Sequence, residues 1–230
     1  MHAIVLAGGR GTRLGPLTRE VPKPMVPVGS RPFLEFVLDR LVEGGLRRIT
    51  LSVGYLAQVV QDHFGFVYRG ADLRYCVEHA PLGTGGALRL ALNGRGEEPA
   101  LVVNGDTLLQ ADFGAIARWY EQAPVPVAMV LRRMDDAGRY GAVAVEGDCV
   151  TGFREKGREG PGLINAGVYV VTPAVFDGLD LPRAFSFETD VLQSHCATLR
   201  PRALVSDAWF IDIGVPADLE RARLELPAPA

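Results

Sequence analysis

Near the start of the chain, residues 7–13 read AGGRGTR and directly follow the apolar run AIVL. Glycines at this density let the backbone approach a ligand closely and let successive N–H groups converge on an anion. Arg10 and Arg13 add forked donors that suit phosphate oxygens. The alternative is a tight, solvated turn. We interpret the loop as a nucleotide-binding segment, formed by Ala7, Gly8, Gly9, Gly11, Thr12 and Arg13.

Two common phosphate-binding motifs do not account for this loop. A Walker A loop ends in Gly-Lys-Ser or Gly-Lys-Thr, and no such ending occurs here. A dinucleotide-binding G-x-G-x-x-G loop runs straight into a helix. Here GGRGTRLG continues into a long loop that is broken by Pro16, Pro22, Pro24 and Pro27. A Rossmann dehydrogenase is therefore disfavoured.

Lys23 lies in that loop between Pro22 and Pro24. The two prolines restrict the local backbone and remove competing N–H donors. A lysine on so stiff a loop can serve as a positioned point charge, although a surface lysine in an extended loop is the alternative. Beside the glycine loop, we interpret Lys23 as a catalytic charge.

Two aspartates follow apolar runs that read as strands. Asp106 ends LVVNGD, and Asp212 lies in WFIDIG. In open α/β sheets, ligands collect at the carboxyl ends of the strands. Mg²⁺ is typically held by one or two carboxylates together with phosphate oxygens and water. A single aspartate after a strand often only caps a turn, but beside a phosphate loop the pair predicts a metal site.

The elements that carry these residues alternate between strands and helices in the first half. Strands are expected at 3–7, 48–54, 73–78 and 100–106, and helices within 31–45, at 55–65 and at 84–92. This order implies a parallel sheet with helices on both faces. The second half adds strands at 125–133, 141–147, 149–156 and 165–171, joined by turns, so mixed or antiparallel pairing is expected there. Short helices are expected at 173–179, 187–196 and 216–226.

The composition bounds the class of protein. A net charge of −3 argues against a general nucleic-acid binder, and no apolar stretch reaches the roughly 20 residues that span a membrane. The N-terminus carries no secretory signal pattern, and the three cysteines are widely spaced. We therefore expect a cytoplasmic protein with reduced thiols. Whether it forms a homo-oligomer is left open.

The stretch LAGGRGTRLGPLTREVPKPM resembles the pattern L-A-G-G-x-G-T-R-L-x-P-L-T-x-x-x-P-K-P of the sugar-1-phosphate nucleotidyltransferases. The resemblance extends over nearly the whole chain, through SVGY (52–55), PLGTGGAL (81–88), VVNGD (102–106), FREK (153–156), NAGVYV (165–170) and FIDIG (210–214). It implies a Rossmann-like, three-layer α/β/α nucleotidyltransferase fold with a mixed, mostly parallel central sheet. We expect one domain over 1–230, with a nucleotide-binding part at 1–110 and a sugar-phosphate-binding part at 111–230.

The resemblance also implies a reaction, in which a nucleoside monophosphate passes from an NTP to a sugar 1-phosphate and pyrophosphate leaves. Catalysis would consist mainly of alignment and charge neutralisation. Arg13 would hold the pyrophosphate and Lys23 would neutralise charge at the α-phosphate. Asp106 and Asp212 match the family's metal-binding aspartates, and Mg²⁺ is the implied cofactor.

The same resemblance places the acceptor sugar phosphate in the second half. Lys156 resembles the family's second catalytic lysine, which meets the acceptor phosphate, and Glu155 would reach a sugar hydroxyl. Gly157 stands where the family commonly has proline. Asn165 and Gly167 match the acceptor-side segment, where Asn165 would bond sugar hydroxyls or cap a turn.

Glu78 carries the choice of base. Guanine presents two adjacent donors that one carboxylate can accept together, whereas uracil and thymine offer a single N–H between carbonyls. This difference favours GTP over UTP. The alternative is that Glu78 is a plain surface residue. The base is expected to lie on the small residues of the following loop, Gly83, Thr84 and Gly85.

Within the family, VEHAPLGTGGAL, FSFETDVL and FIDIGVPADLERA resemble the D-glycero-α-D-manno-heptose 1-phosphate guanylyltransferases. That resemblance implies GDP-heptose synthesis for a bacterial surface glycan. Mannose-1-phosphate guanylyltransferases and N-acetylmuramate-1-phosphate uridylyltransferases are the alternatives. A non-catalytic sensor of nucleotide sugars would not need both aspartates, Lys23 and Arg13, so an enzyme is favoured.

Overall fold

The central strand β1 (His2–Leu6) shows why the sheet is covered on both faces. Its side chains alternate, so Ala3 and Val5 pack into one hydrophobic core while Ile4 packs into a second core on the opposite face. Strands β4 (Arg48–Val53) and β7 (Ala100–Asn104) pair with β1 in parallel. An unbroken apolar run is typical of strands buried in this way. The computed structural model describes residues 1–94, 96–157 and 159–226.

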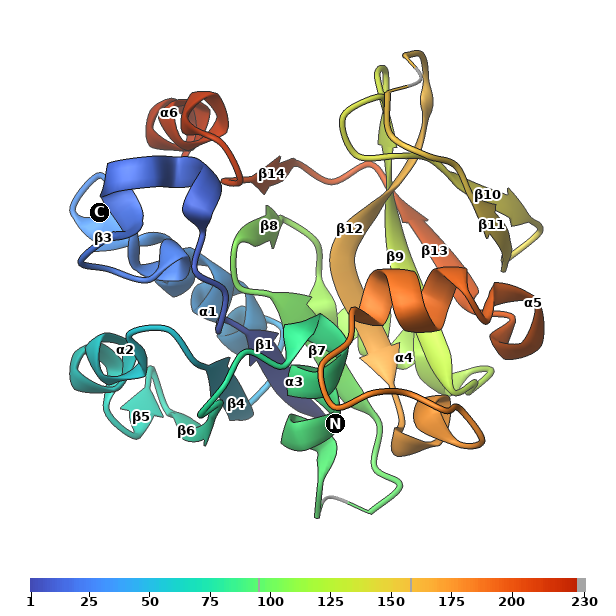
Figure 1. Ribbon diagram of the computed structural model, residues 1–230, viewed down its shortest axis with the longest axis horizontal. Coiled ribbons are helices and arrows are strands. Elements are labelled where there is room, and N and C mark those ends of the chain that lie inside the picture. The colour runs from blue at the N-terminus through green and yellow to red at the C-terminus, as the bar shows by residue number, and fades with distance from the viewer. Residues whose placement is uncertain (95, 158, 227–230) are drawn as a thin grey trace.

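The main sheet has ten strands in the order β10-β11-β13-β9-β12-β7-β1-β4-β6-β5 (Figure 1). Its other strands are β5 (Val67–Tyr68), β6 (Ala71–Val77), β9 (Val127–Met134), β10 (Val143–Glu146), β11 (Cys149–Phe153), β12 (Gly162–Val171) and β13 (Arg202–Ser206). The pairings make seven strands run in one direction, namely β1, β4, β6, β7, β9, β10 and β13, while β5, β11 and β12 run in the other. The predicted mixed sheet is confirmed, and most of its strands share one direction, although the pairings made by β5, β11 and β12 are antiparallel.

Helices cover both faces of this sheet (Figure 1). One core is shared by α1 (Phe33–Glu43), α2 (Ala57–Phe64), α4 (Phe113–Glu121) and α6 (Pro216–Glu225). The other is shared by α3 (Gly83–Leu92), the π-helical segment η4 (Phe187–Gln193) and α5 (Cys196–Leu199). The three-layer α/β/α arrangement is therefore as predicted. Because β7 pairs with β12, the sheet continues across the predicted division near residue 110, and that division stays a prediction.

Two small sheets lie outside the main one and matter for the site. One pairs β8 (Thr107–Leu109) with β14 (Phe210–Asp212). The other is a hairpin of β2 (Pro27–Val28) and β3 (Arg31–Pro32). Two 3-10 segments, η1 (Thr12–Thr18) and η2 (Lys23–Met25), connect β1 to that hairpin.

The structure differs from the sequence prediction mainly in the second half. Helix α4, capped by Asp112 through a 2.9 Å bond from Ala115 N, and strand β13 were not predicted. The helix expected at 173–179 is one 3-10 turn, η3 (Pro173–Phe176). The helix expected at 187–196 is η4 followed by α5, and the strand expected at 149–156 ends at Phe153. Strand β12 begins at Gly162, before the predicted residue 165, and its pairing with β9 shifts register at a bulge between Asn165 and Val168.

Candidate active site

The glycine loop leaves the carboxyl end of β1 with its amides open. Within the described part of the chain, no backbone N–H of residues 8–13 donates a hydrogen bond. Gly11 has a left-handed φ of 63°, and a Cβ there would lie 2.7 Å from Lys23 Cβ. Glycine at this position therefore lets the loop pack directly on the lysine. The open amides suit an anion, as the sequence predicts.

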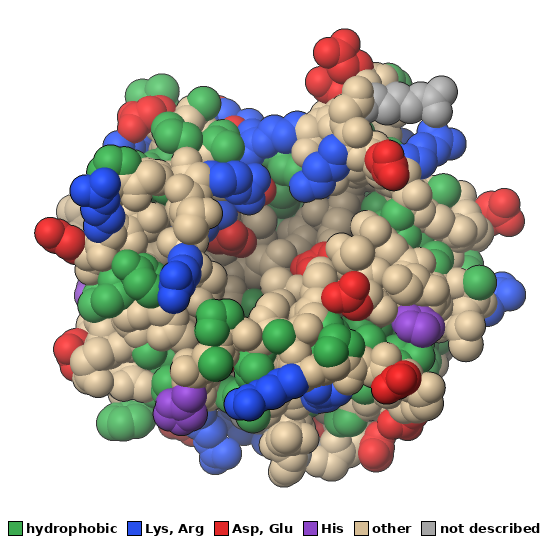
Figure 2. Space-filling model, viewed as in Figure 1, with side chains coloured by type: hydrophobic (Ala, Val, Ile, Leu, Met, Phe, Trp, Pro, Cys, Tyr) green, Lys and Arg blue, Asp and Glu red, His purple; other side chains and the backbone are tan. Residues whose placement is uncertain are grey.

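A cavity of about 460 Å³ lies beside this loop. The face of the molecule drawn in Figure 2 is hollowed near its centre. The cavity forms where the carboxyl ends of β1, β4, β6 and β7 converge, which is the usual ligand position in an open α/β sheet. Its lining includes six predicted site residues, namely Gly8, Gly9, Glu78, Gly83, Thr84 and Asp106. The lining also includes Arg10, which the sequence predicts as a donor to phosphate oxygens. Sequence reasoning missed three further lining residues: Tyr55, His79 and Asn104.

Glu78 presents a half-buried carboxylate to this cavity. Its Oε2 accepts a 3.1 Å hydrogen bond from Leu82 N. Its Oε1 lies against Gly8, where any Cβ would overlap it. Burial raises the pKa of Glu78, and the Leu82 N–H partly offsets that effect. Further N–H donors from a ligand would therefore stabilise its charged form.

Lys23 joins the two predicted metal-binding aspartates. The side chain is 6% exposed, and its Nζ lies 2.5 Å from Asp106 Oδ2 and 3.6 Å from Asp212 Oδ1. Lys23 and Lys156 are the two lysines of the sequence, which has 24 lysine and arginine residues together. The three charges predicted from separate motifs thus lie together at one point.

The small β8–β14 sheet brings the aspartates together. Asp212 pairs with Thr107, the residue after Asp106. Ile213 N also donates a 3.0 Å bond to Asp106 O. Two residues that are far apart in the sequence are therefore held as neighbours by backbone hydrogen bonds.

The electrostatics of Asp212 suit a bound cation. Burial raises its pKa, the charge of Asp106 raises it further, and Lys23 opposes both effects. Asp212 Oδ1 is buried and has no hydrogen-bond partner among the described residues. Carboxylate oxygens are the ligands that Mg²⁺ prefers, and one or two protein carboxylates suffice. Asp106 and Asp212 could therefore hold Mg²⁺, and no group of three or more potential metal ligands occurs in the described ranges.

Two arginine side chains lie near Asp212, and the charge of one of them, Arg139, opposes the rise in the pKa of Asp212. A Cβ on Gly214 would lie 3.3 Å from Arg13 Nη2 and 2.9 Å from Asp212 Oδ1. Glycine at 214 therefore lets Arg13 and Asp212 come close. Arg139, from the loop after β9, pairs with Asp218 of α6.

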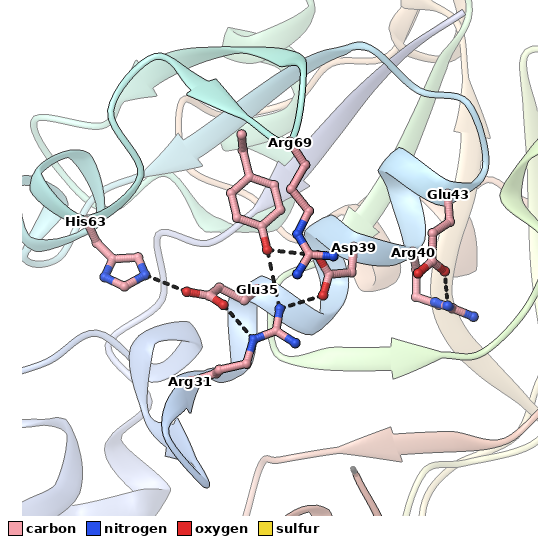
Figure 3. A network of polar contacts seen from close by, with 8 residues as sticks. Arg31, Glu35, Asp39, Arg40, Glu43, His63 and Arg69 are labelled. Atoms are coloured by element: carbon pink, nitrogen blue, oxygen red, sulfur yellow. Dashed lines mark hydrogen bonds and ion pairs between the residues drawn. The ribbon is translucent and has the colours of Figure 1, made fainter. Parts of the chain in front are cut away.

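A polar network holds the hairpin that follows Lys23 (Figure 3). Arg31 donates to Glu35 at 2.6 Å and to Asp39 at 2.5 Å, both on α1. Tyr68 donates to Asp39 at 2.8 Å, and His63 Nε2 lies 2.8 Å from Glu35. Burial alone would lower the pKa of Arg31, but the bonds to Asp39 and Glu35 raise it. The network ties the end of the Lys23 loop to α1, α2 and β5.

The glycines at the start of α3 pack tightly against a distant segment, and their predicted role toward the base stays a prediction. Gly83 lines the cavity, but its φ is 69° and a Cβ there would overlap the Phe185 carbonyl. A Cβ on Gly85 would overlap the Phe185 ring. Gly85 is thus needed for packing against the segment before η4, and it is absent from the cavity lining. Thr84 lines the cavity, but its hydroxyl donates to Glu188 at 2.6 Å.

The predicted acceptor residues fall into two groups. Glu155 and Lys156 are exposed in the loop after β11. Asn165 and Gly167 lie in the bulge of β12, where Asn165 Oδ1 accepts a 3.0 Å bond from Gly167 N. The turn-capping alternative for Asn165 is therefore present in the structure. The roles of these residues toward a sugar phosphate stay predictions.

Comparison with known sequences supports a common origin over the whole chain. Residues 2–228 match the Nucleotidyl transferase family. The D-glycero-alpha-D-manno-heptose 1-phosphate guanylyltransferase of Aneurinibacillus thermoaerophilus is 38% identical over 226 residues, which cover 98% of each chain. The enzyme of the same name from Campylobacter jejuni is 40% identical over 219 residues, covering 95% of this chain and 96% of that one.

Solved structures agree with this similarity. The crystal structure of HddC from Yersinia pseudotuberculosis matches with a TM-score of 0.87 at 32% identity, covering 99% of this chain and 100% of that chain. The structure of HddC complexed with GMP-PN matches with a TM-score of 0.85. No helix of the described residues combines the length and apolarity needed to span a bilayer.

Proposed function

Because the chain belongs to the nucleotidyl transferase family, we propose that it transfers the guanylyl group of GTP to D-glycero-α-D-manno-heptose 1-phosphate and releases pyrophosphate. The observation that carries this proposal is the meeting of Lys23, Asp106 and Asp212 beside a loop whose amides are open. The names of the relatives support a guanylyl donor and a heptose 1-phosphate acceptor, and the GMP-PN complex of HddC supports a guanine nucleotide.

The proposed division of labour follows from where the charges lie. The amides of 8–13 and Arg13 bind the β- and γ-phosphates, which leave as pyrophosphate. Lys23 is buried and sits between the two carboxylates, so it neutralises charge at the α-phosphate. In this proposal the protein forms no covalent bond to the substrate, so catalysis depends on alignment and charge.

We propose that Asp106 and Asp212 hold Mg²⁺ as the cofactor. The ion would supply Lewis-acid polarisation of the α-phosphate oxygens when bound. Asp212 contributes a buried oxygen that lacks a hydrogen bond, and Asp106 contributes a partly exposed one. Lys23 offsets one of the two negative charges of the pair, and the bound cation would offset the other.

Glu78 is the proposed reader of the base. Its carboxylate can accept the N1–H and N2–H₂ donors of guanine together, and a pyrimidine would leave it with one donor and a repelling carbonyl. Its raised pKa reflects a buried charge that needs such donors. Ligand donors that replace lost water are worth most at a site of this kind.

The acceptor binds, in this proposal, on the side of β11 and β12. Lys156 contacts the acceptor phosphate, Glu155 a sugar hydroxyl, and Asn165 with Gly167 shapes the sugar site. The product would be a GDP-heptose, a donor for surface-glycan assembly. We place the reaction in the cytoplasm because the three cysteines are free thiols.

A matrix of nucleotides and sugars tests the proposal. Pyrophosphate release is measured with GTP or UTP, with and without Mg²⁺, against heptose, mannose, glucose and N-acetylmuramic acid 1-phosphates. We expect the highest kcat/KM with GTP and the heptose. Preference for another pair would reassign the substrates, and nucleotide-sugar binding without any turnover would support a sensor instead.

A further inference from the structure

Glu188, in the first turn of η4, collects three hydroxyl groups from different parts of the chain. Its carboxylate lies 2.6 Å from Thr84 Oγ1, 3.2 Å from Ser186 Oγ and 3.2 Å from the Tyr169 hydroxyl. Thr84 lies on α3 and Tyr169 on β12, so the carboxylate links these two elements. π-Helical turns such as η4 are often found at functional sites.

The charge of Glu188 sets the direction of the hydrogen bonds around it. An ionised carboxylate only accepts, so Thr84 and Tyr169 must both donate to it. The Tyr169 oxygen is then free to accept from Asn165 Nδ2 at 2.7 Å. Asn165 Oδ1 in turn accepts from Gly167 N, which can only donate. One negative charge therefore orders a chain of hydrogen bonds.

The environment keeps this order in place. Tyr169 is fully buried, and burial together with the charge of Glu188 raises its pKa well above the ordinary value, so it remains a donor. Thr84 Oγ1 also accepts a 2.9 Å bond from Phe187 N, which leaves its hydrogen to Glu188. Buried networks of this kind are strong only when every member is satisfied.

The two ends of this hydrogen-bond network lie at the proposed site. Thr84 lines the cavity in the first turn of α3. At the other end, a Cβ on Gly167 would lie 2.8 Å from both Asn104 Nδ2 and Thr107 Oγ1. Those two residues flank Asp106 in the sequence. The position of the β12 bulge is thus coupled to the strand end that carries a proposed metal ligand.

We propose that Glu188 is a positioning residue for the acceptor, because its charge orients Asn165 and the β12 bulge through Tyr169. The inference rests on the proposed function, in which that bulge shapes the sugar site. Misalignment of the attacking phosphate oxygen should lower turnover, while the GTP phosphates, held by the glycine loop, should bind as before.

The test compares Glu188→Gln with the wild type. The two side chains have the same shape, but the glutamine amide donates, so at least one hydroxyl of the network must reverse. We expect kcat/KM for the heptose 1-phosphate to fall tenfold or more, while the Kd of GTP, measured by calorimetry without acceptor, changes less than twofold. The control is Glu225→Gln, because Glu225 also accepts a hydrogen bond, from Trp209 Nε1 at 2.7 Å, but lies on α6. It should leave both quantities unchanged.

Tyr169→Phe provides a second variant should Glu188→Gln fold poorly, and it carries the same expectation. The double variant should be no worse than the more damaging single variant, because both break one chain. The inference would be overturned if GTP affinity and the kcat/KM for the acceptor fell equally. It would also be overturned if the loss in the double variant equalled the product of the two single losses. If the wild type transfers guanylyl groups and Glu188→Gln matches Glu225→Gln, only the inference fails. If the wild type is inactive with every acceptor, the proposed function itself fails.

Discussion

Replacing Lys23 with methionine removes the cation that lies between two carboxylates. Breaking a buried ion pair from one side costs about 3–5 kcal/mol. Here the Asp106 side chain is 34% exposed, so water can partly solvate the uncompensated charge. We therefore expect the free energy of unfolding to fall by about 2–3 kcal/mol without Mg²⁺, which corresponds to a decrease in Tm of about 4–12 °C for a chain of this size.

Magnesium should reverse part of that loss. In the wild type a cation must compete with the Lys23 ammonium for Asp106 and Asp212, whereas in the variant it does not. A ligand at ten times its Kd stabilises the folded state by about 1.4 kcal/mol. Thermal unfolding over a Mg²⁺ titration should therefore show a larger Mg²⁺-dependent rise in Tm for Lys23→Met than for the wild type. Turnover should still fall by about 10²-fold at saturating Mg²⁺, because the α-phosphate has lost a preorganised charge.

Lys156→Met is the matched control, since it changes the other lysine, which is exposed. It should leave Tm within about 1 °C, because exposed charges contribute little to stability. If Lys23→Met is as stable as this control, the charge balance described for the two acids is wrong. If it is destabilised but Mg²⁺ gives no extra stabilisation, the electrostatics are right and the metal site is wrong.

The remaining predictions concern other parts of the site. Asp106→Asn should lower kcat by about 10²-fold or more, and near-wild-type turnover at saturating Mg²⁺ would remove Asp106 from the metal site. Glu78→Gln should reduce kcat/KM for GTP more than for UTP, and an equal loss for both would show that Glu78 does not read the base. Burial raises the pKa of Asp212, so the native state binds the proton of this carboxyl group more tightly than the unfolded state does. The contribution of Asp212 to the free energy of unfolding is therefore present below the ordinary pKa of 3.8 and is lost as pH rises through the raised pKa. Asp212→Asn without Mg²⁺ should thus be more stable than the wild type near pH 7 and lose this advantage toward pH 4 in urea unfolding, and a pH-independent difference would contradict the assignment. Arg31→Met should lower the free energy of unfolding in urea by about 3 kcal/mol, since the Arg31 side chain is 15% exposed and its two acidic partners are similarly buried. Arg40→Met breaks a more exposed ion pair on α1 (Figure 3) and should cost less than about 1 kcal/mol. Similar losses for both variants would refute the role of the network.

The residues that meet at the site were predictable because each stood in a local pattern. The glycine loop, Lys23 between two prolines, and an aspartate after each apolar run all carry a signal within a few residues. Their meeting depends on the pairing of β8 with β14, three residues each. Strands that short have no readable periodicity, so the sequence leaves their partner undefined.

Other features escaped prediction for different reasons. Helix α4 does carry a local signal, because Phe113, Ile116 and Tyr120 share one buried face after the Asp112 cap. The packing of the α3 glycines against Phe185 could not be predicted, because Phe185 lies 100 residues after Gly85 in the sequence. Glu188 was missed for a similar reason, since its partner Thr84 is 104 residues away.

The use of only two lysines has a practical consequence. An amine-acylating reagent meets one enclosed side-chain amine, at Lys23, and one open side-chain amine, at Lys156. Each occurs in a different peptide, so mass spectrometry can follow the two labelling rates separately. Slower acylation of Lys23 on adding GTP, and of Lys156 on adding the sugar phosphate, would report the binding of each substrate in solution without any engineered probe.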